Sequence, residues 1–199
     1  MKKGLMKSPK TGIILAGGSS SRMGFPKGLL TVDGEPMIRK VHRNLNNLCD
    51  EVIVIANSGH YDFLELPVYE DIIPAKGPAS GIHTGLSVSQ TSLNLIMPCD
   101  MPFIAPKVLK VLEGYTSYHQ VIFPECRSQW FPVCGFYDKA LLPLFHESLL
   151  EERLSIRQIV SRSQYQPVSF PESYENVFQN INTPQDLNSS PSSLKATSL

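Results

Sequence analysis

The sequence has no long apolar segment. None of its 199 residues lies in a run that approaches the roughly 20 apolar residues needed to span a membrane. The N-terminal residues carry the positive charge of a signal peptide but lack its apolar core. We therefore expect a soluble, cytoplasmic protein without a membrane partner.

The chain also has no excess of charge of either sign. Its 18 basic residues balance 18 acidic residues, so the formal net charge is +0 at pH 7. A protein without a strong positive field has no general attraction to a nucleic-acid backbone. We expect no nucleic-acid partner, and any phosphate binding must depend on a few local residues.

Cysteine and histidine motifs are absent as well. The four cysteines form no C-x-x-C pair, which favours free thiols over disulfides. None of the five histidines lies in a recognisable motif, and the sequence contains no internal repeat. A mechanism that relies on a histidine-activated nucleophile is therefore not indicated.

The most informative stretch covers residues 11–30, T-G-I-I-L-A-G-G-S-S-S-R-M-G-F-P-K-G-L-L. Its apolar start predicts a buried strand over 12–16. Glycines and serines follow at 17–21, and such a turn can present several N–H groups to phosphate oxygens. Arg22 and Lys27 then supply positive charge, which favours an anion site over a plain surface turn. Neither a G-x-x-x-x-G-K-[ST] loop nor a G-x-G-x-x-G loop is present.

Strands and helices are predicted to alternate along the chain. Apolar runs predict further strands over 51–56, 66–70, 93–97, 120–124, 131–137 and 178–182. Apolar residues at helical spacing predict helices over 36–47, 78–90, 106–113, 138–149 and 154–160. This order predicts an α/β fold: a three-layer α/β/α, Rossmann-like sandwich with a mainly parallel sheet and a later antiparallel excursion.

One domain accounts for this pattern. We expect an N-terminal extension over 1–10, a single domain over 11–188 and a disordered tail over 189–199, which has too few apolar residues to order itself. Asp33-Gly34 predicts a tight turn, and Thr183 predicts the start of a last helix.

Polar side chains follow two of the predicted strands. Asp100 comes after an apolar strand, where a carboxylate needs donors or a cation, and Mg²⁺ held by one carboxylate plus phosphates is an ordinary solution. A helix cap before Pro102 is the equal alternative. Asn180 and Asn182 lie on one side of an extended chain, although asparagines often serve only in turns and caps. The crevice of an open α/β sheet lies outside the carboxyl ends of its strands, so Asp100 can face the loop at 17–21.

Four short motifs occur in the order in which one enzyme family carries them. They are L-A-G-G-S-S-S-R-M-G-F-P-K-G-L-L at 15–30, K-G-P-A-S-G-I at 76–82, P-C-D-M-P at 98–102 and F-Q-N-I-N-T-P at 178–184. They are similar to L-A-G-G-x-x-x-R-M-G-x-x-K-x-L-L, G-P-x-x-G, C-D-x-P and N-x-N-T-P. The sequence therefore resembles the nucleotidyltransferases related to molybdenum cofactor guanylyltransferase, in the nucleotide-diphospho-sugar transferase-like superfamily.

The resemblance covers nearly the whole chain and implies a role for each matching residue. The implied nucleotide-binding residues are Leu15, Ala16, Gly17, Gly18, Lys27, Asn57, Asp71, Gly77, Pro78, Gly81 and Asp100. The implied acceptor-binding residues are Arg22, Arg157, Asn180 and Asn182. Arg22, Lys27 and Asp100 form the implied catalytic set, with Asp100 as the ligand of Mg²⁺.

The sequence departs from the family pattern in three places. Pro26 stands where many relatives have an aspartate before the lysine. A proline at this position resembles the R-M-G-x-x-x-P-K pattern of other sugar and alcohol nucleotidyltransferases. An asparagine of the second strand falls on Ile55 here, although Asn57 points to the same face of an extended chain. The segment that ends at Arg157 only loosely resembles the family's serine-x-arginine segment, and an arginine on an exposed helix is usually just solvated.

The resemblance implies transfer of GMP from GTP to the phosphate of molybdopterin or the molybdenum cofactor, with release of pyrophosphate. The implied partners are GTP, the molybdopterin acceptor, other cofactor-biosynthesis proteins and chaperones of apo-molybdoenzymes. Recognition of guanine by backbone groups leaves little trace in a sequence. Two alternatives therefore stay open: a cytidylyltransferase of the same fold acting on molybdopterin or another phosphorylated acceptor, and a non-catalytic nucleotide-binding regulatory module.

Overall fold

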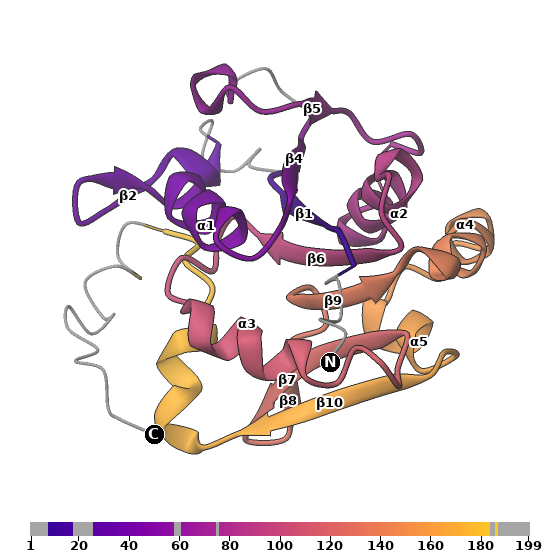
Figure 1. The fold of residues 1–199 in the computed structure, drawn as a ribbon. Coiled ribbons are helices and arrows are strands. Elements are labelled where there is room, and N and C mark those ends of the chain that lie inside the picture. The colour runs from indigo at the N-terminus through magenta and orange to yellow at the C-terminus, as the bar shows by residue number, and fades with distance from the viewer. Residues whose placement is uncertain (1–7, 18–25, 58–60, 75, 184–185, 187–199) are drawn as a thin grey trace, which may run out of the picture.

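An eight-stranded sheet forms the centre of the computed structural model, which describes residues 8–17, 26–57, 61–74, 76–183 and 186 (Figure 1). The strands are β1 (Lys10–Leu15), β4 (Glu51–Ile55), β5 (Val68–Tyr69), β6 (Leu93–Pro98), β7 (Val121–Cys126), β8 (Gln129–Trp130), β9 (Gly135–Asp138) and β10 (Tyr165–Phe170). Their order is β10-β7-β9-β6-β1-β4-β5, with β8 paired to β7.

The sheet is mainly parallel, as predicted. β6, β1, β4 and β5 pair in parallel with one another, and β7 pairs in parallel with β10. β9 lies antiparallel between β6 and β7, and β8 is antiparallel to β7. These strands form the predicted antiparallel excursion, and they leave β7 running in the same direction as β6.

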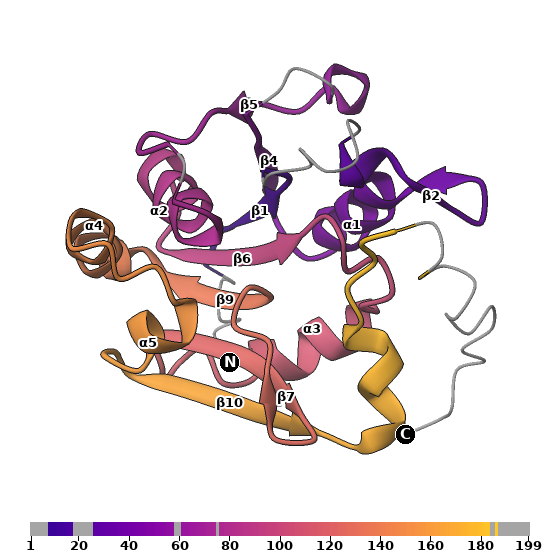
Figure 2. The ribbon, with the colours of Figure 1, turned by 180° about the vertical axis from the view of Figure 1, so that it is seen from behind.

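Helices cover both faces of the sheet, which confirms the three-layer prediction (Figures 1 and 2). They are α1 (Met37–Asn46), α2 (Pro78–Val88), α3 (Pro106–Glu113), α4 (Leu142–Leu150) and α5 (Ile156–Val160), with 3-10 turns η2 (Lys27–Leu29), η3 (Asp62–Leu64), η4 (Lys139–Leu141) and η5 (Glu172–Phe178). α1 and α3 lie on one face, whereas α2, α4 and α5 lie on the other.

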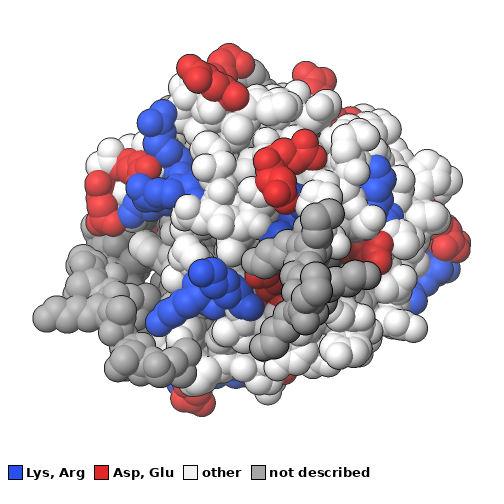
Figure 3. Space-filling view, in the orientation of Figure 1, with Lys and Arg blue, Asp and Glu red and all other residues white. Residues whose placement is uncertain are grey.

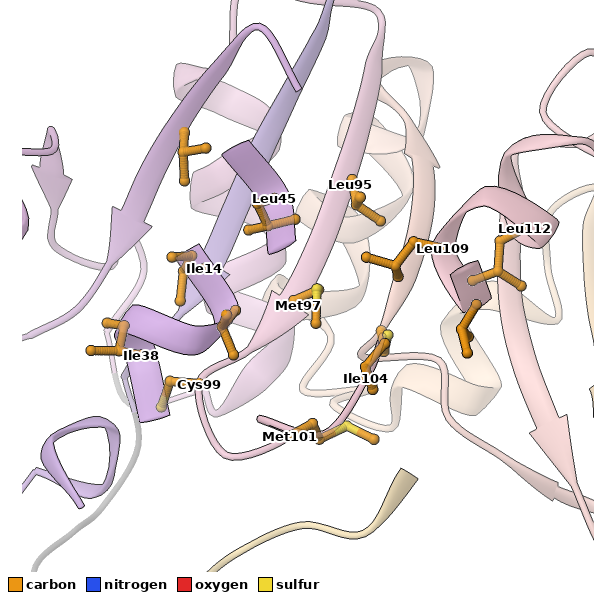
Figure 4. Close-up of a cluster of buried hydrophobic side chains, with 14 of the residues drawn as sticks. Ile14, Ile38, Leu45, Leu95, Met97, Cys99, Met101, Ile104, Leu109 and Leu112 are labelled. Carbon is orange, nitrogen blue, oxygen red and sulfur yellow. The ribbon is translucent and has the colours of Figure 1, made fainter. Parts of the chain in front are cut away.

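The alternation of side chains along the strands divides the core into two apolar layers. Ile14 and Met97 point toward α1 and α3, where Figure 4 shows them among buried side chains such as Leu45 and Leu109. The neighbouring Ile13 instead points toward α2. Both layers exclude water, so the sheet is a rigid base from which the carboxyl ends of the strands emerge.

A small hairpin precedes α1. β2 (Thr31–Val32) and β3 (Glu35–Pro36) pair antiparallel, and Asp33 and Gly34 join them with φ angles of 55° and 78°. Both angles belong to the left-handed region that a two-residue turn of this type requires. The tight turn predicted from Asp33-Gly34 is therefore confirmed.

The predicted strand over 178–182 is wrong. η5 ends at Phe178, and residues 179–183 belong to no strand; a backbone hydrogen bond from Ile181 N to Asp100 O (2.8 Å) ties this segment to the end of β6. The edge strand is instead β10, which the sequence analysis left unassigned. Pro167 interrupts the apolar pattern of β10, and a proline is tolerated there because one side of an edge strand needs no partner.

The limits of the expected domain fall near the ends of the described residues. β1 begins at Lys10, which the sequence analysis placed in the N-terminal extension. The expected tail over 189–199 lies outside the described residues. Thr183 and Asp186 exchange hydrogen bonds, Thr183 N to Asp186 Oδ2 (2.8 Å) and Asp186 N to Thr183 Oγ1 (3.3 Å), as at a helix start.

The charged side chains of both signs are interspersed on the face shown in Figure 3, in keeping with the balanced composition. Within the ranges that the structure describes, no helix has the length and apolar character needed to cross a lipid bilayer.

Candidate active site

The carboxyl ends of β1, β4 and β6 meet at one edge of the sheet. Ala16 N donates to Ile55 O (2.9 Å), and Cys99 N donates to Leu15 O (3.0 Å), so these three strands stay in register to their last residues. Gly17 therefore emerges between the end of β4 and the end of β6. This arrangement is the crevice that the order of the strands predicts.

Lys27 and the C-terminal segment close one side of this edge. Lys27 Nζ donates to Asn182 Oδ1 (2.6 Å), and the hydrogen bond from Ile181 N to Asp100 O ties the same segment to the end of β6. Asp186 Oδ2 in turn accepts from Asn182 N (2.8 Å). Three residues that are far apart in the sequence, Lys27, Asp100 and Asn182, thus come together.

Asp186 was missed by the sequence analysis. Its carboxylate fixes the backbone at Asn182 and Thr183, and these two hydrogen bonds lower the pKa of Asp186. The signal was present as T-x-x-D at 183–186, the spacing at which an acidic residue in the first turn completes a helix cap.

Burial and the charge of Lys27 act on the Asp100 carboxylate in opposite directions. Burial raises its pKa, while the positive charge of Lys27 lowers it. No cluster of three or more potential histidine, cysteine, aspartate or glutamate ligands occurs among the described residues. A divalent ion held here would therefore have one protein carboxylate and would take its other ligands from phosphates and water, which is common for Mg²⁺.

Asn57 and Asp71 face each other on the other side of Gly17. Asn57 Nδ2 donates to Asp71 Oδ2 (2.9 Å), and Asp71 N donates to Asn57 Oδ1 (2.9 Å). The second carboxylate oxygen, Asp71 Oδ1, is buried and has no hydrogen-bond partner among the residues that the structure describes. An unsatisfied buried acceptor is costly, so Asp71 Oδ1 is a ready position for an incoming N–H group.

The start of α2 borders the same space. Gly77 has a φ of 63°, which favours glycine, and Pro78 occupies the first turn of the helix. A Cβ atom added at Gly81 would lie 3.0 Å from Leu15 Cδ2 and 3.9 Å from Asp71 Oδ1. The small residues therefore allow the first turn of α2 to approach both β1 and Asp71 closely.

Four predicted site residues, Gly18, Arg22, Asn180 and Arg157, are not yet accounted for. Gly18 and Arg22 lie outside the described residues. Asn180 is exposed. Arg157 lies on α5, where its guanidinium stacks 4.4 Å from the ring centroid of Trp130, and no hydrogen bond or ion pair joins it to the described residues of the cluster. The acceptor roles of Asn180 and Arg157 stay predictions.

The family model of the MobA-like NTP transferase domain matches residues 12–168. A probable molybdenum cofactor guanylyltransferase of Flavobacterium johnsoniae is 31% identical over 179 residues, which cover 89% of this chain and 94% of the relative. A molybdenum cofactor guanylyltransferase of Desulfosudis oleivorans is 30% identical over 197 residues, 94% of this chain and 96% of the relative.

A solved structure has the same fold. Molybdopterin-guanine dinucleotide biosynthesis protein A of Archaeoglobus fulgidus superposes with a TM-score of 0.72 at 22% sequence identity, over 90% of this chain and 96% of that one. The family model and the two relatives cover the strands and helices that build the edge described above. This chain therefore belongs to the family of MobA-like NTP transferases.

Proposed function

We propose that this protein transfers GMP from GTP to the phosphate of molybdopterin or of its molybdenum form. The observation that carries the proposal is the meeting of Lys27, Asp100 and Asn182 at the carboxyl edge of the sheet. The resemblance assigns the first two to the triphosphate and the third to the acceptor. A direct contact between the two sets is what transfer between the two ligands requires.

The chemistry needs no general base from the protein. The acceptor is a phosphomonoester with a second pKa of about 6, so its oxygen is mostly ionised at neutral pH. That oxygen attacks the α-phosphorus of GTP, a new P–O bond forms, and the bond between the α-phosphorus and the bridging oxygen breaks. Pyrophosphate leaves with the bonding electron pair. The protein has to hold two anions in line and offset their repulsion.

Lys27 supplies part of that positive charge. Its ammonium group lies between the segment of Asn182 and the carboxylate of Asp100, whose pKa it lowers. In the bound state we assign Lys27 to the phosphates of GTP and Asn182 to the acceptor phosphate. The hydrogen bond between Lys27 and Asn182 then keeps the acceptor phosphate close to the triphosphate.

Asp100 would hold a Mg²⁺ ion. A desolvated carboxylate such as that of Asp100 gains from a divalent cation, because the cation stabilises its charged form. Bound Mg²⁺ neutralises charge on the phosphates of GTP and on the leaving pyrophosphate. The role of this chain is to place Asp100 at the end of β6, next to Lys27.

Asp71 is the proposed contact to the base. Guanine carries two adjacent donors, N1–H and the N2 amino group, and Asp71 Oδ1 is a buried acceptor that no described residue bonds. The resemblance implies that Asp71 binds the nucleotide, and backbone groups are the expected contacts to guanine; we assign the Asp71 carboxylate to the base as an additional determinant. A base that leaves it unpaired loses about 1–3 kcal/mol for each unsatisfied group.

The test compares nucleotides and then adds the acceptor. With Mg²⁺, GTP should raise the melting temperature more than CTP or ATP at equal concentration. Pyrophosphate should appear only when molybdopterin is also supplied. A larger shift and faster pyrophosphate release with CTP would replace the guanylyltransferase by a cytidylyltransferase, and binding without any release would favour a regulatory module.

A further inference from the structure

The loop that contains Asp71 is fixed to helix α2 by two buried hydroxyl groups. Ile72 N donates to Thr84 Oγ1 (2.9 Å), and Ser80 Oγ donates to Ile73 O. Both Ser80 and Thr84 are 0% exposed. The loop residues that follow Asp71 are therefore held by side chains of the helix.

These hydroxyls are unusual choices for a buried helix face. Threonine and serine are weak helix formers, and a buried hydroxyl is costly unless it is hydrogen-bonded. Serine in a helix often bonds back to its own backbone, as Ser87 Oγ does to His83 O (2.8 Å). Ser80 and Thr84, one helical turn apart, instead bond across to the loop, so their hydrogen bonds fix the position of another segment.

Three consecutive backbone positions are held in this way. Asp71 N donates to Asn57 Oδ1, Ile72 N to Thr84, and Ile73 O accepts from Ser80. The Asp71 carboxylate is attached through Oδ2 to Asn57, while Oδ1 has no partner within the described part of the chain. The backbone on both sides of the side chain is thus fixed, and one oxygen is left for a ligand.

We propose that Thr84 is a positioning residue for base selection. By holding Ile72 N, it keeps Asp71 Oδ1 at the place where the N–H groups of a purine base arrive. Thr84 touches no nucleotide itself and acts through Asp71. This inference rests on the proposed function for the identity of the base, but the loop contact does not depend on it.

Thr84→Val keeps the shape of the side chain and removes the hydroxyl, while Thr84→Ser keeps the hydroxyl. The probes are GTP and inosine triphosphate, which lacks the N2 amino group, each bound with Mg²⁺ and measured by calorimetry. The wild-type protein should prefer GTP by about tenfold, the value of one good hydrogen bond. Thr84→Val should reduce that ratio to about two- to threefold, and Thr84→Ser should restore it.

Thr91→Val is the matched control. Thr91 is also a buried threonine, and its Oγ1 accepts a hydrogen bond from Thr11 N (3.0 Å). Unlike Thr84, Thr91 lies beside the amino end of β1, on the opposite edge of the sheet from the candidate site. The control should lower the melting temperature and leave the GTP-to-inosine ratio unchanged. If Thr84→Val also lowers stability without changing the ratio, Thr84 has only a structural role and the proposal is wrong. If Thr84→Val does not fold, Thr84→Ala is measured in its place, with the same two outcomes.

The experiment separates this proposal from the proposed function. If the wild-type protein binds CTP more tightly than GTP, guanylyl transfer is excluded. The ratio of the affinities for CTP and UTP then becomes the readout of base selection. A ratio that falls in Thr84→Val and recovers in Thr84→Ser supports the positioning role for either base. A ratio that is unchanged in Thr84→Val overturns it.

Discussion

Asp100 is the residue on which the proposed chemistry most depends. It lies two residues after the end of β6, burial raises its pKa, and the positive charge of Lys27 lowers it. Asp100→Asn keeps the shape but removes the charge that attracts Mg²⁺. Turnover should fall by orders of magnitude, while the melting temperature stays the same or rises, because a desolvated charge opposes folding. Pyrophosphate release and thermal unfolding measure the two effects.

Asp33→Asn is a suitable control for this change. Asp33 is exposed in the β2–β3 turn and pairs with Lys40, away from the carboxyl edge of β6. It should leave both turnover and the melting temperature nearly unchanged. Near-normal turnover of Asp100→Asn at saturating Mg²⁺ would remove Asp100 from the proposed metal site.

Lys27 should contribute to phosphate binding and not to base binding. An ammonium group acts on phosphate charge, and hydrogen bonds to charged groups contribute about 1.5–3 kcal/mol. Lys27→Ala should therefore weaken GTP binding by about ten- to a hundredfold and leave guanosine binding nearly unchanged. Calorimetry with both ligands gives the two losses.

The corresponding control is Lys40→Ala, which removes a lysine that pairs with Asp33. It should change neither ligand's affinity. Equal losses for GTP and guanosine in Lys27→Ala would mean that the lysine supports the site as a whole, through its bond to Asn182, and does not act on the triphosphate.

The secondary-structure elements show which parts of the fold a sequence can predict. α3 has the predicted bounds, 106–113, because its apolar side chains recur at helical spacing and Pro106 marks its start. β10 was missed since Pro167 and polar neighbours hide its pattern. The segment at 178–182 has the composition of a strand, yet Ile181 makes its one backbone bond to Asp100 and no ladder forms.

The candidate site also has parts that the sequence predicts and parts that it does not. The place of Asp100 follows from the rule that ligand sites lie at the carboxyl ends of parallel strands, whereas Lys27 and Asn182 are linked to it only by the family motifs. The free oxygen of Asp71 depends on which of its two oxygens Asn57 takes. The hydroxyl of Thr84 depends on how α2 is rotated against the loop. Neither detail is encoded in a local pattern.

Close packing of elements gives a prediction at two glycines. A Cβ atom at Gly85 would lie 2.7 Å from Ile13 Cγ2, so α2 and β1 touch there. A Cβ atom at Gly135 would lie 2.1 Å from Ile122 O, a backbone atom of β7. Gly85→Ala should cost about 1 kcal/mol, because overpacking exceeds the gain in helix propensity. Gly135→Ala should cost more than about 4 kcal/mol, because the ladder between β7 and β9 has to separate.

Urea unfolding of both variants measures these free energies. Gly114→Ala is the control at the exposed end of α3, where a Cβ atom would lie 3.3 Å from Val111 O, and its effect should stay within about 0.5 kcal/mol. A Gly135→Ala variant as stable as Gly85→Ala would contradict the close approach of β9 to β7.

At the scale of the whole molecule, the sheet brings together segments that are distant in the sequence. The family model ends at residue 168, but the contact of Lys27 with Asn182 and the bond from Ile181 to Asp100 lie beyond it. The last described segment is therefore part of the candidate site, although it belongs to no strand of the sheet.

The pH dependence of that stability is predicted from two histidines. Burial lowers the pKa of His83, and His146 lowers it further, while Asp71 has the opposite effect. Burial and Arg39 lower the pKa of His42. An unfolded histidine has a pKa of about 6.5, so near and below that pH the unfolded chain binds more protons than the folded one. Stability is therefore present above about pH 6.5 and is lost as the pH falls toward the lower pKa values of the folded state.

Thermal unfolding without nucleotide is followed from about pH 7.5 to about pH 5.5, a window that brackets the pKa of an unfolded histidine, whereas the carboxylates of unfolded chains titrate mainly below it. The wild-type melting temperature should fall across it. The fall should be smaller in His83→Gln and in His42→Gln, and smallest in the double variant, since each change removes one group that takes up a proton on unfolding. High salt should preserve most of the difference, because burial, the larger cause in both cases, is not screened by ions as surface charges are. Equal slopes in the wild-type protein and the double variant would show that both histidines keep an ordinary pKa in the folded state, and the pH dependence would then have to come from other groups.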